Sequence, residues 1–248
     1  MKISIITATY NSADTITDTL RSVEAQKYPD IEHIIIDCQS KDNTLQIVST
    51  YKHIAKVISE PDDGIYDAMN KGISLATGDI IGILNSDDFY DSNEVISSVV
   101  ELFQSDPSID CLYADLAYVD KNKLGRVVRK WVSGSFKRSS FLNGWMPPHP
   151  TFFVRKDLYL KFGDFNVALK TAADYELMLR FLYKHNCQCV YLSTTIVNMR
   201  SGGASNQSLK ARFLANRQDR LAWEINGLKP RFYTLYLKPL RKIVQYFH

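Results

Sequence analysis

Short apolar runs alternate with segments of helical spacing along the first 105 residues. The runs are dense in isoleucine at consecutive positions, which is typical of strands buried on both faces of a parallel sheet. In residues 65–76 the apolar side chains recur every three or four positions, which predicts a helix that Gly78 ends. Four such strand–helix units predict an α/β fold with helices on both faces of a mostly parallel sheet. The predicted strands are 3–8, 33–37, 54–59 and 79–84, and the predicted helices are 11–25, a short one carrying Leu45 and Val48, 65–76 and 93–104.

The pattern becomes irregular in the second half of the chain. Residues 145–150 contain three prolines and cannot form a helix. We expect one α/β domain over residues 1–206, with halves 1–105 and 106–206, and then a helical extension over 207–248. Further strands are predicted at 111–118, 127–132, 151–154 and 187–192, the first two antiparallel, and further helices at 155–162, 171–183 and 209–225.

The composition is typical of a globular protein. Of the 248 residues, 45% are hydrophobic and 23% are charged, and no apolar stretch approaches the roughly 18 residues of a spanning helix. The start of the chain lacks the pattern of a secretory signal peptide. Four cysteines do not form a disulfide framework in a chain of this length. We therefore expect a cytoplasmic protein with free thiols.

Basic residues concentrate at the C-terminal end. The net charge of the chain is +3, but residues 207–248 hold nine Lys or Arg against two acidic residues, a net +7. Residues 229–247 mix cations with aromatic and aliphatic side chains, and Pro239 is expected to divide them into two short helices. Such a segment suits the anionic inner face of the cell membrane, or packing on the rest of the protein or on a second subunit. The acidic edge described next argues against a nucleic-acid partner.

Carboxylates follow the predicted strands. Asp37 ends the second strand, Asp87 and Asp88 follow the fourth, and Thr9 and Tyr10 follow the first. Ligands of parallel sheets bind beyond the carboxyl ends of the strands, so these side chains should line one crevice. The glycine-rich fingerprints of dinucleotide and P-loop sites are missing after the first strand. Carboxylates suit Mg²⁺ or Mn²⁺ bridged to substrate phosphates, although turns alone also favour aspartate.

Five motifs, in order along residues 3–205, resemble those of family 2 glycosyltransferases, which are inverting enzymes with the Rossmann-like GT-A fold. Each motif is short and common by itself, and the resemblance depends on their order and spacing. The C-terminal 40 or so residues lie outside it. The matching stretches are Ile5–Asn11, Asp37–Thr44, Glu60–Gly72, Asn85–Asp88 and Ala173–Leu177, the last followed by Arg180.

The resemblance implies that residues 1–105 bind a nucleoside diphosphate sugar, with a UDP sugar as the commonest choice of the family. It makes Asp88, expected at an exposed strand end, the ligand of a divalent cation, Mn²⁺ or Mg²⁺, and it places Asp87 nearer the ribose. A cation there stabilises the charge of the departing diphosphate. Structural turn or surface roles are the alternative at each position. The other donor-binding residues that the resemblance implies are Thr7, Thr9, Tyr10, Asp37, Asp67 and Asn70.

The second half of the domain should supply the general base that removes the proton of the acceptor hydroxyl. Family members place Glu-Asp at the start of a helix, with the Asp as the base. Here Ala173 stands in place of the Glu, and Asp174 keeps the position of the Asp. The resemblance therefore implies Asp174 as the general base, with Glu176 as the reserve candidate. His149 in the proline-rich loop and Arg200 are candidates for acceptor or phosphate contacts, against purely structural roles.

These features favour an inverting glycosyltransferase that moves a sugar from a nucleotide sugar to a hydroxyl of a glycan or lipid-linked acceptor. Surface polysaccharide or lipopolysaccharide assembly is the expected setting. A sugar-phosphate nucleotidyltransferase would share the sheet, but its first loop would be glycine-rich and basic, unlike Thr7–Asn11. A sugar-nucleotide-binding module without transferase activity could dispense with Asp88 or Asp174, and both are present.

Overall fold

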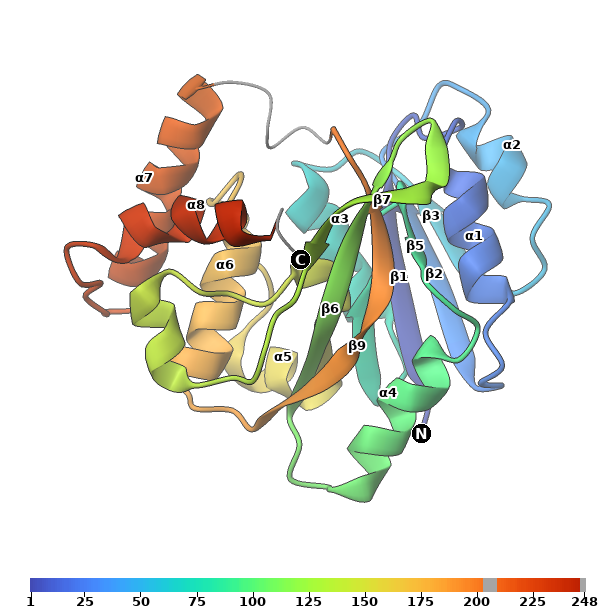
Figure 1. Cartoon of the computed structure of the whole chain (residues 1–248). Helices are drawn as coiled ribbons and strands as arrows, with labels where there is room; N and C mark the ends of the chain where they lie inside the picture. Colours follow the sequence, from blue (N-terminus) through green and yellow to red (C-terminus); the bar gives the residue numbers. More distant parts are fainter. Residues whose placement is uncertain (203–208, 246–248) are drawn as a thin grey trace.

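The structure, a computed structural model, describes residues 1–202 and 209–245. Its centre is one sheet in the order β3-β2-β1-β4-β8-β6-β9-β5, with β7 paired to β6 off this path (Figure 1). The strands are β1 (Ile3–Thr9), β2 (Ile31–Asp37), β3 (Ile54–Ser59), β4 (Ile80–Ile83), β5 (Asp88–Tyr90), β6 (Cys111–Asp120), β7 (Lys123–Trp131), β8 (Phe153–Arg155) and β9 (Cys189–Arg200), and the helices are α1 (Ile16–Glu24), α2 (Thr44–Val48), α3 (Ile65–Leu75), α4 (Val95–Ser105), α5 (Lys156–Phe162), α6 (Ala173–Met178), α7 (Leu209–Ile225) and α8 (Thr234–Val244).

The first four strands of this order are parallel, which confirms the predicted α/β fold with strand–helix units. Their register places Thr9, at the end of β1, beside Asp37, at the end of β2. β8 runs antiparallel to both β4 and β6, so the second half of the sheet is mixed. β6 and β7 form the antiparallel pair that the sequence predicts.

Two strands differ from the sequence-based expectation. β9 continues to Arg200 instead of ending at Leu192, and β5 pairs antiparallel with its far end, where Asp88 faces Met199. β5 is only three residues long, which is too short to show an alternating pattern. Asp88 is therefore the first residue of β5, the last strand in the sheet order, instead of the exposed end of the strand before it.

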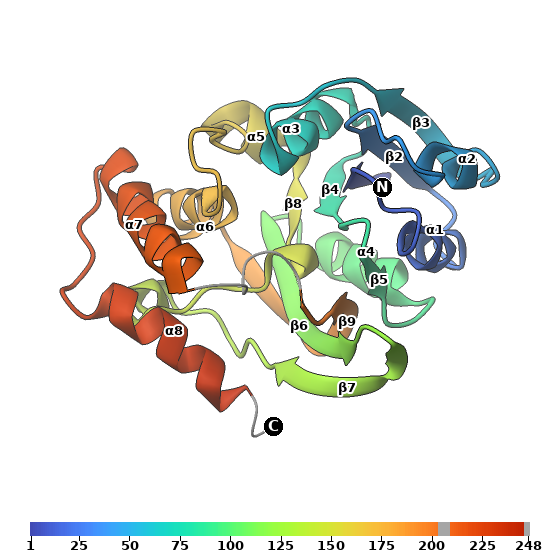
Figure 2. The same cartoon turned by 90° about the horizontal axis from the view of Figure 1, so that it is seen from above.

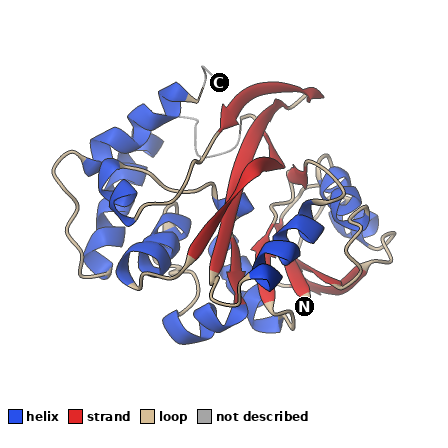
Figure 3. Ribbon diagram, turned by 60° about the horizontal axis from the view of Figure 1, so that its bottom comes forward, coloured by secondary structure: helices blue, strands red, loops and turns tan. Residues whose placement is uncertain are grey.

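The isoleucines of β2 show how the sheet separates two layers of helices. Ile34 and Ile36 pack in the core under α3, whereas Ile35 packs with α1 and α2. Successive side chains of a strand point to opposite faces, so consecutive isoleucines serve both layers. Figure 2 shows α3, α5, α6 and α7 on one side of the sheet and α1 and α4 on the other. Figure 3 shows the strands as one twisted layer between them.

α8 is a single helix with Pro239 inside it, so the expected break at Pro239 is wrong. A proline lacks the N–H group that would bond to the carbonyl four residues earlier. That carbonyl belongs to Leu235, and the side-chain amide of Asn216 in α7 donates to it at 3.1 Å. A neighbouring helix thus satisfies the freed group, and the sequence of the tail alone does not reveal this.

The C-terminal helices are packed into the main core. Trp223 of α7 is fully buried and donates its indole N–H to the Tyr175 hydroxyl at 2.9 Å. Thr234 of α8 donates to the Leu142 carbonyl at 2.6 Å, and Leu235 is buried next to it. The four cysteines are free, as expected. Within the described ranges, no helix is both long and apolar enough to cross a bilayer.

We predict that Trp223→Ala lowers the free energy of unfolding by about 3–5 kcal/mol, because it leaves a large cavity in the core. Urea denaturation monitored by circular dichroism measures this. Leu221→Ala, on the exposed face of the same helix, is the matched control and should change stability by less than about 0.5 kcal/mol. Equal, small effects of both variants would mean that α7 is a detachable extension.

Candidate active site

The ends of β1, β2 and β4 meet at the carboxyl edge of the sheet. The loop after β4 is tied to the segment after β1, because the hydroxyls of Ser12 and Ser86 lie 2.9 Å apart. The Thr15 hydroxyl also donates to the Ser86 carbonyl at 2.9 Å, and the Thr19 hydroxyl donates to the Asp88 carbonyl at 2.7 Å. The structure thus brings together the loops whose convergence the sequence predicts.

Asp37 is fully buried beneath this edge. Its Oδ2 accepts hydrogen bonds from the Ser40 backbone N–H at 3.0 Å and from the Ser59 hydroxyl at 2.6 Å. The Ser40 hydroxyl donates to its Oδ1 at 2.5 Å. Three donors compensate the charge that burial would otherwise penalise. Three of its roughly four acceptor sites are thus occupied within the protein, and a ligand that reaches Asp37 would share the carboxylate with these donors.

Asp88 is 0% exposed, so the expectation that it lies at an exposed strand end is wrong. Asn85 donates to its Oδ2 at 2.9 Å, whereas Oδ1 is buried without a hydrogen-bond partner in the described part of the chain. Burial, followed by the neighbouring charge of Asp87, raises the pKa of Asp88 well above its ordinary value. A buried carboxylate oxygen without a donor fits a site that a cation or a proton completes.

Asp87 is the more accessible of the two carboxylates, because it is only partly buried. Burial raises its pKa, and the charge of Arg200 acts in the opposite direction. Arg200 donates to the Asp87 carbonyl and forms an ion pair with Asp18 of α1. These bonds make Arg200 a brace of the Asp87 loop. The predicted phosphate contact of Arg200 would require it to leave both partners.

The three candidates at the end of β1 have different surroundings. Thr7 is buried with its hydroxyl 3.0 Å from Nε2 of His33, so it belongs to the core and does not face a nucleobase as predicted. Thr9 lies at the rim, and its buried hydroxyl has no partner among the described residues. Tyr10 is 58% exposed just beyond the strand, and such a ring can stack on a base.

Asp67 and Asn70, the predicted donor-binding residues of α3, also differ. Asp67 accepts the Asp63 backbone N–H at 3.1 Å and lies 3.5 Å from Nζ of Lys71. Both ends of the Asn70 amide bond to one backbone unit: Nδ2 donates to the Phe165 carbonyl at 2.8 Å, and Oδ1 accepts the Phe165 N–H at 2.9 Å. Asn70 is therefore a clamp between the halves of the domain, and its predicted donor contact is not supported.

Asp174 lies in the first turn of α6 and is partly exposed. Its Oδ1 accepts a hydrogen bond from the Tyr66 hydroxyl at 3.1 Å. Burial lowers the pKa of His149, and the charge of Asp174 acts in the opposite direction, so the two groups are within electrostatic reach. The turn His149–Thr151 contacts β4. Asp174 and His149 therefore stand beside the strand that leads to Asp87.

Glu176 does not fit its predicted role as a reserve base or substrate contact. Its carboxylate is 1% exposed and lies 3.0 Å from the Arg180 guanidinium. Asn226 of the C-terminal segment donates to the same carboxylate at 2.8 Å. A carboxylate that is paired, hydrogen-bonded and buried on all sides is a structural ion-pair partner.

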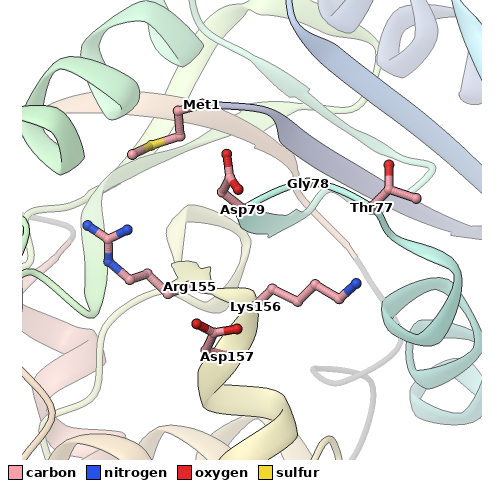
Figure 4. Close-up of a pocket in the computed structure, with 7 residues that line it drawn as sticks. All are labelled: Met1, Thr77, Gly78, Asp79, Arg155, Lys156 and Asp157. Atoms are coloured by element: carbon pink, nitrogen blue, oxygen red, sulfur yellow. The ribbon is translucent and has the colours of Figure 1, made fainter.

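A cavity of about 460 Å³ lies at the opposite end of the sheet (Figure 4). Met1 and Asp79, at the start of β1 and β4, belong to its lining. The Asp79 carboxylate accepts the Lys2 backbone N–H at 2.8 Å, and Lys156 donates its ammonium to the Ala76 carbonyl at 2.6 Å. Asp79 and Lys156 are thus engaged within the protein, and ligands of such sheets bind at the other edge.

Two residues near the candidate site escaped the sequence analysis. Tyr66 contacts Asp174 across 108 residues of chain, and Asp18 pairs with Arg200 across 182. Tyr66 stands in the matching stretch Glu60–Gly72, which was the available clue. Its partner could not be identified before the packing of α3 against α6 was known.

Comparison with known proteins identifies the family of the chain. The model of Glycosyl transferase family 2 matches residues 4–162, more than half of the chain. An uncharacterised glycosyltransferase of Mycobacterium tuberculosis, Rv1514c, is 34% identical over 181 residues, which cover 72% of this chain and 68% of that protein. A PGL/p-HBAD biosynthesis glycosyltransferase of Mycobacterium bovis is 27% identical over 217 residues, 85% of this chain and 82% of that protein.

Solved structures show the same fold. TarS of S. aureus, residues 1–349 in complex with UDP-GlcNAc, superimposes with a TM-score of 0.75 at 23% identity, over 96% of this chain and 69% of that one. A mannosyltransferase of Pyrobaculum calidifontis in complex with GDP-Man and Mn²⁺ gives a TM-score of 0.67 at 18% identity, over 96% and 68%. The chain belongs to glycosyl transferase family 2, and it is a glycosyltransferase.

The raised pKa of Asp88 predicts a pH-dependent stability. A carboxyl group titrates near 3.9 when unfolded, so the folded state holds the Asp88 proton at pH values where the unfolded state has lost it. The free energy of unfolding should therefore fall as the pH rises from about 4 through the raised pKa. Asp88→Asn should flatten this fall.

Urea denaturation between pH 4 and pH 8 in the presence of a metal chelator measures the effect. Asp30→Asn, which removes an exposed carboxylate, is the control and should retain the fall. A pH profile of Asp88→Asn that matches the profile of the unmodified protein would contradict the buried, unpaired state of Asp88.

Proposed function

We propose that this glycosyltransferase moves a sugar, with inversion, from a nucleoside diphosphate sugar to a hydroxyl of a glycan or lipid-linked acceptor. The observation that carries the proposal is the position of Asp174. Tyr66 lies in the first turn of α3, the helix that follows β3, and donates to Asp174 at the start of α6. A helix that follows a strand of a parallel sheet begins at the carboxyl edge, so this bond ties Asp174 to the edge that Asp37, Asp87 and Asp88 belong to. In the proposal these three carboxylates would serve the donor, and Asp174 would serve the acceptor.

The relatives support the chemical class of the substrates. TarS binds UDP-GlcNAc, and the Pyrobaculum enzyme binds GDP-Man together with Mn²⁺. Similarity to a PGL/p-HBAD biosynthesis glycosyltransferase supports a role in cell-envelope glycoconjugates, of which surface polysaccharide and lipopolysaccharide are the expected examples. A UDP sugar remains the first donor to test.

The carboxylate pair fits a divalent cation, Mn²⁺ or Mg²⁺. Asp88 has a buried oxygen without a donor, and the partly exposed Asp87 reaches the rim. No group of three or more His, Cys, Asp or Glu in residues 1–202 and 209–245 is arranged to hold a metal ion by itself, so the donor phosphates would complete the shell. Because Asp88 is covered, we propose Asp87 as the direct ligand and Asp88 as the charge behind it. The cation would offset charge on the departing diphosphate.

Asp174 would act as the general base. Its free oxygen accepts the proton of the acceptor hydroxyl, and the hydroxyl oxygen attacks the anomeric carbon from the side opposite the diphosphate. Tyr10 would stack on the nucleobase, and Asp37 would receive a ribose hydroxyl in place of a serine. His149, within electrostatic reach of Asp174, would contact the acceptor.

The test is a panel of UDP, GDP and dTDP sugars, assayed for nucleoside diphosphate release and product mass with and without Mn²⁺. We predict turnover of at least one donor, and a rate lower by 10²–10⁴-fold in Asp174→Asn, because the shape is kept and the proton acceptor is lost. Donor affinity should stay the same. A chain that binds donors without transferring them would be a binding module, and release of pyrophosphate from a nucleoside triphosphate and a sugar 1-phosphate, supplied in a parallel assay, would indicate a nucleotidyltransferase.

The carboxylate pair makes a second prediction. Asp87→Asn should abolish Mn²⁺-dependent turnover, because it removes the accessible ligand. Asp88→Asn keeps a side-chain oxygen that can accept the hydrogen bond from Asn85, and it removes only the charge. This variant should retain measurable Mn²⁺-dependent turnover. Rates measured across a Mn²⁺ titration distinguish the variants. If Asp88→Asn lost more Mn²⁺-dependent turnover than Asp87→Asn, Asp88 would be the direct ligand instead.

A membrane surface is the third proposed partner, and the exposed face of the C-terminal segment supports it. Phe232, Tyr236 and Leu240 recur every four residues and are 87%, 66% and 54% exposed. Lys229 and Arg241 are exposed in the same segment. Exposed apolar and cationic side chains in one short segment, α8 and the residues just before it, suit an anionic lipid interface, where a lipid-linked acceptor would lie. Tyr246 and Phe247 of the predicted segment lie outside the described residues.

We predict that the full chain co-sediments with anionic vesicles at low salt and is released at high salt. The variant with serine at Phe232, Tyr236 and Leu240 should stay in the supernatant. Because Leu235 is buried, removal of α8 would expose the core, so point substitutions are preferable to truncation. Leu160→Ser, another exposed apolar position, is the control. Binding that survives the triple substitution would exclude this face.

A further inference from the structure

α3 connects the two halves of the domain through one of its faces. Tyr66 and Asn70 are four residues apart on this helix, so both side chains point in the same direction. α3 follows β3 in the half proposed to bind the donor, whereas the partners of both residues lie in the half proposed to bind the acceptor. The contacts of this face therefore decide how the acceptor side is placed relative to the donor side.

The first contact fixes the backbone before α6. Asn70 donates to the Phe165 carbonyl at 2.8 Å and accepts the Phe165 N–H at 2.9 Å. Such a two-way bond holds a peptide segment in both position and orientation. The Phe165 ring then stacks on Tyr66, with centroids 5.5 Å apart and planes 28° from parallel. Asn70 of α3 thus anchors Phe165, and Phe165 in turn packs on one face of the Tyr66 ring of the same helix.

The second contact reaches Asp174 itself. The Tyr66 hydroxyl lies 3.1 Å from Oδ1 of Asp174 and donates to it. We propose that Tyr66 is a positioning residue that fixes the orientation of Asp174 for proton removal from the acceptor. This inference rests on the proposed role of Asp174 as the general base. Nothing in the family resemblance assigns a task to Tyr66.

The direction of the hydrogen bond determines what Tyr66 can do. Burial, followed by the charge of Asp174, raises the pKa of the Tyr66 phenol, so the phenol stays protonated and can only donate to a carboxylate. Donation to Oδ1 fixes the orientation of the Asp174 carboxylate and leaves Oδ2 for the acceptor hydroxyl. The acceptor hydroxyl then gives its proton to Oδ2. Its oxygen forms the bond to the anomeric carbon as the bond to the diphosphate breaks and the electron pair leaves with the phosphate oxygen.

The same arrangement couples the base to the donor half. A carboxylate on the first turn of a short helix has rotamer freedom of its own, and general-base catalysis depends on placement within hydrogen-bond reach. Tyr66 restricts this freedom through α3, the helix that follows the Asp62–Gly64 loop. Ala173, the residue before Asp174, has no polar side chain that could do so.

The most direct test observes Asp174 without any substrate. In protein labelled with ¹³C at the aspartate carboxyls, the Asp174 resonance is identified by its loss in Asp174→Asn. In Tyr66→Phe, which keeps the ring and its stacking, this resonance should be displaced at constant pH, because Oδ1 loses the phenol donor. Tyr28→Phe is the control, since it removes a phenol that donates to the Met1 carbonyl at the other end of the sheet.

A second arm uses the donor that turns over fastest in the nucleotide-sugar panel. We expect kcat of Tyr66→Phe to fall roughly tenfold with KM for the donor unchanged, because the base loses its orientation. Phe165→Leu, which keeps the phenol and removes the stacking, should displace the Asp174 resonance by less.

The two arms separate the possible failures. An Asp174 resonance at the same position in Tyr66→Phe, Tyr28→Phe and the unmodified protein overturns the positioning role, whatever the activity. A normal rate in Asp174→Asn overturns the proposed base, while a displaced resonance would still show that Tyr66 positions this carboxylate.

Discussion

The cost of burying carboxylates at the carboxyl edge of the sheet controls the architecture of the candidate site. A parallel sheet covered by helices on both faces places the ends of its strands in a low-dielectric environment, where an unpaired charge is expensive. Hydrogen bonds from two serines offset this cost at Asp37. At Glu176, the ion pair with Arg180 and a hydrogen bond from Asn226 offset the same cost of burial. Asp88 differs, because one of its oxygens has no donor among the described residues. The fold compensates its structural carboxylates and leaves this one incomplete.

That difference explains how the site divides its tasks. The incomplete carboxylate lies beside the partly exposed Asp87, on the side proposed to hold the diphosphate and its cation. Asp174 lies across α3, with one oxygen bonded to Tyr66. A glycosyltransferase must stabilise negative charge on the leaving group and accept a proton from the acceptor, and these needs favour separate carboxylates in different surroundings. Arg200 and Asn70, predicted as substrate contacts, instead hold the two sides in place.

Much of this architecture follows from local pattern. The isoleucine runs predict the parallel strands, and the rule that such sheets bind ligands at their carboxyl ends predicts where Asp37, Asp87 and Asp88 converge. The sequence fails where a residue depends on a distant partner. Asp88 is buried because β5 pairs with the end of β9, more than a hundred residues later. Pro239 stays within a helix because Asn216 satisfies the freed carbonyl. No local sequence pattern identifies the end of β9 or Asn216 as the partner in these contacts.

The central claim is that the carboxylate pair of the sheet edge is completed by a cation bound together with a nucleoside diphosphate. Isothermal titration of the full chain with UDP and with GDP, in Mn²⁺ and in a metal chelator, tests this most directly. The account predicts that one of the two nucleotides binds at least tenfold more tightly in Mn²⁺, because the cation bridges carboxylate and phosphate oxygens. Equal affinity with and without metal, or binding of neither nucleotide, would contradict it.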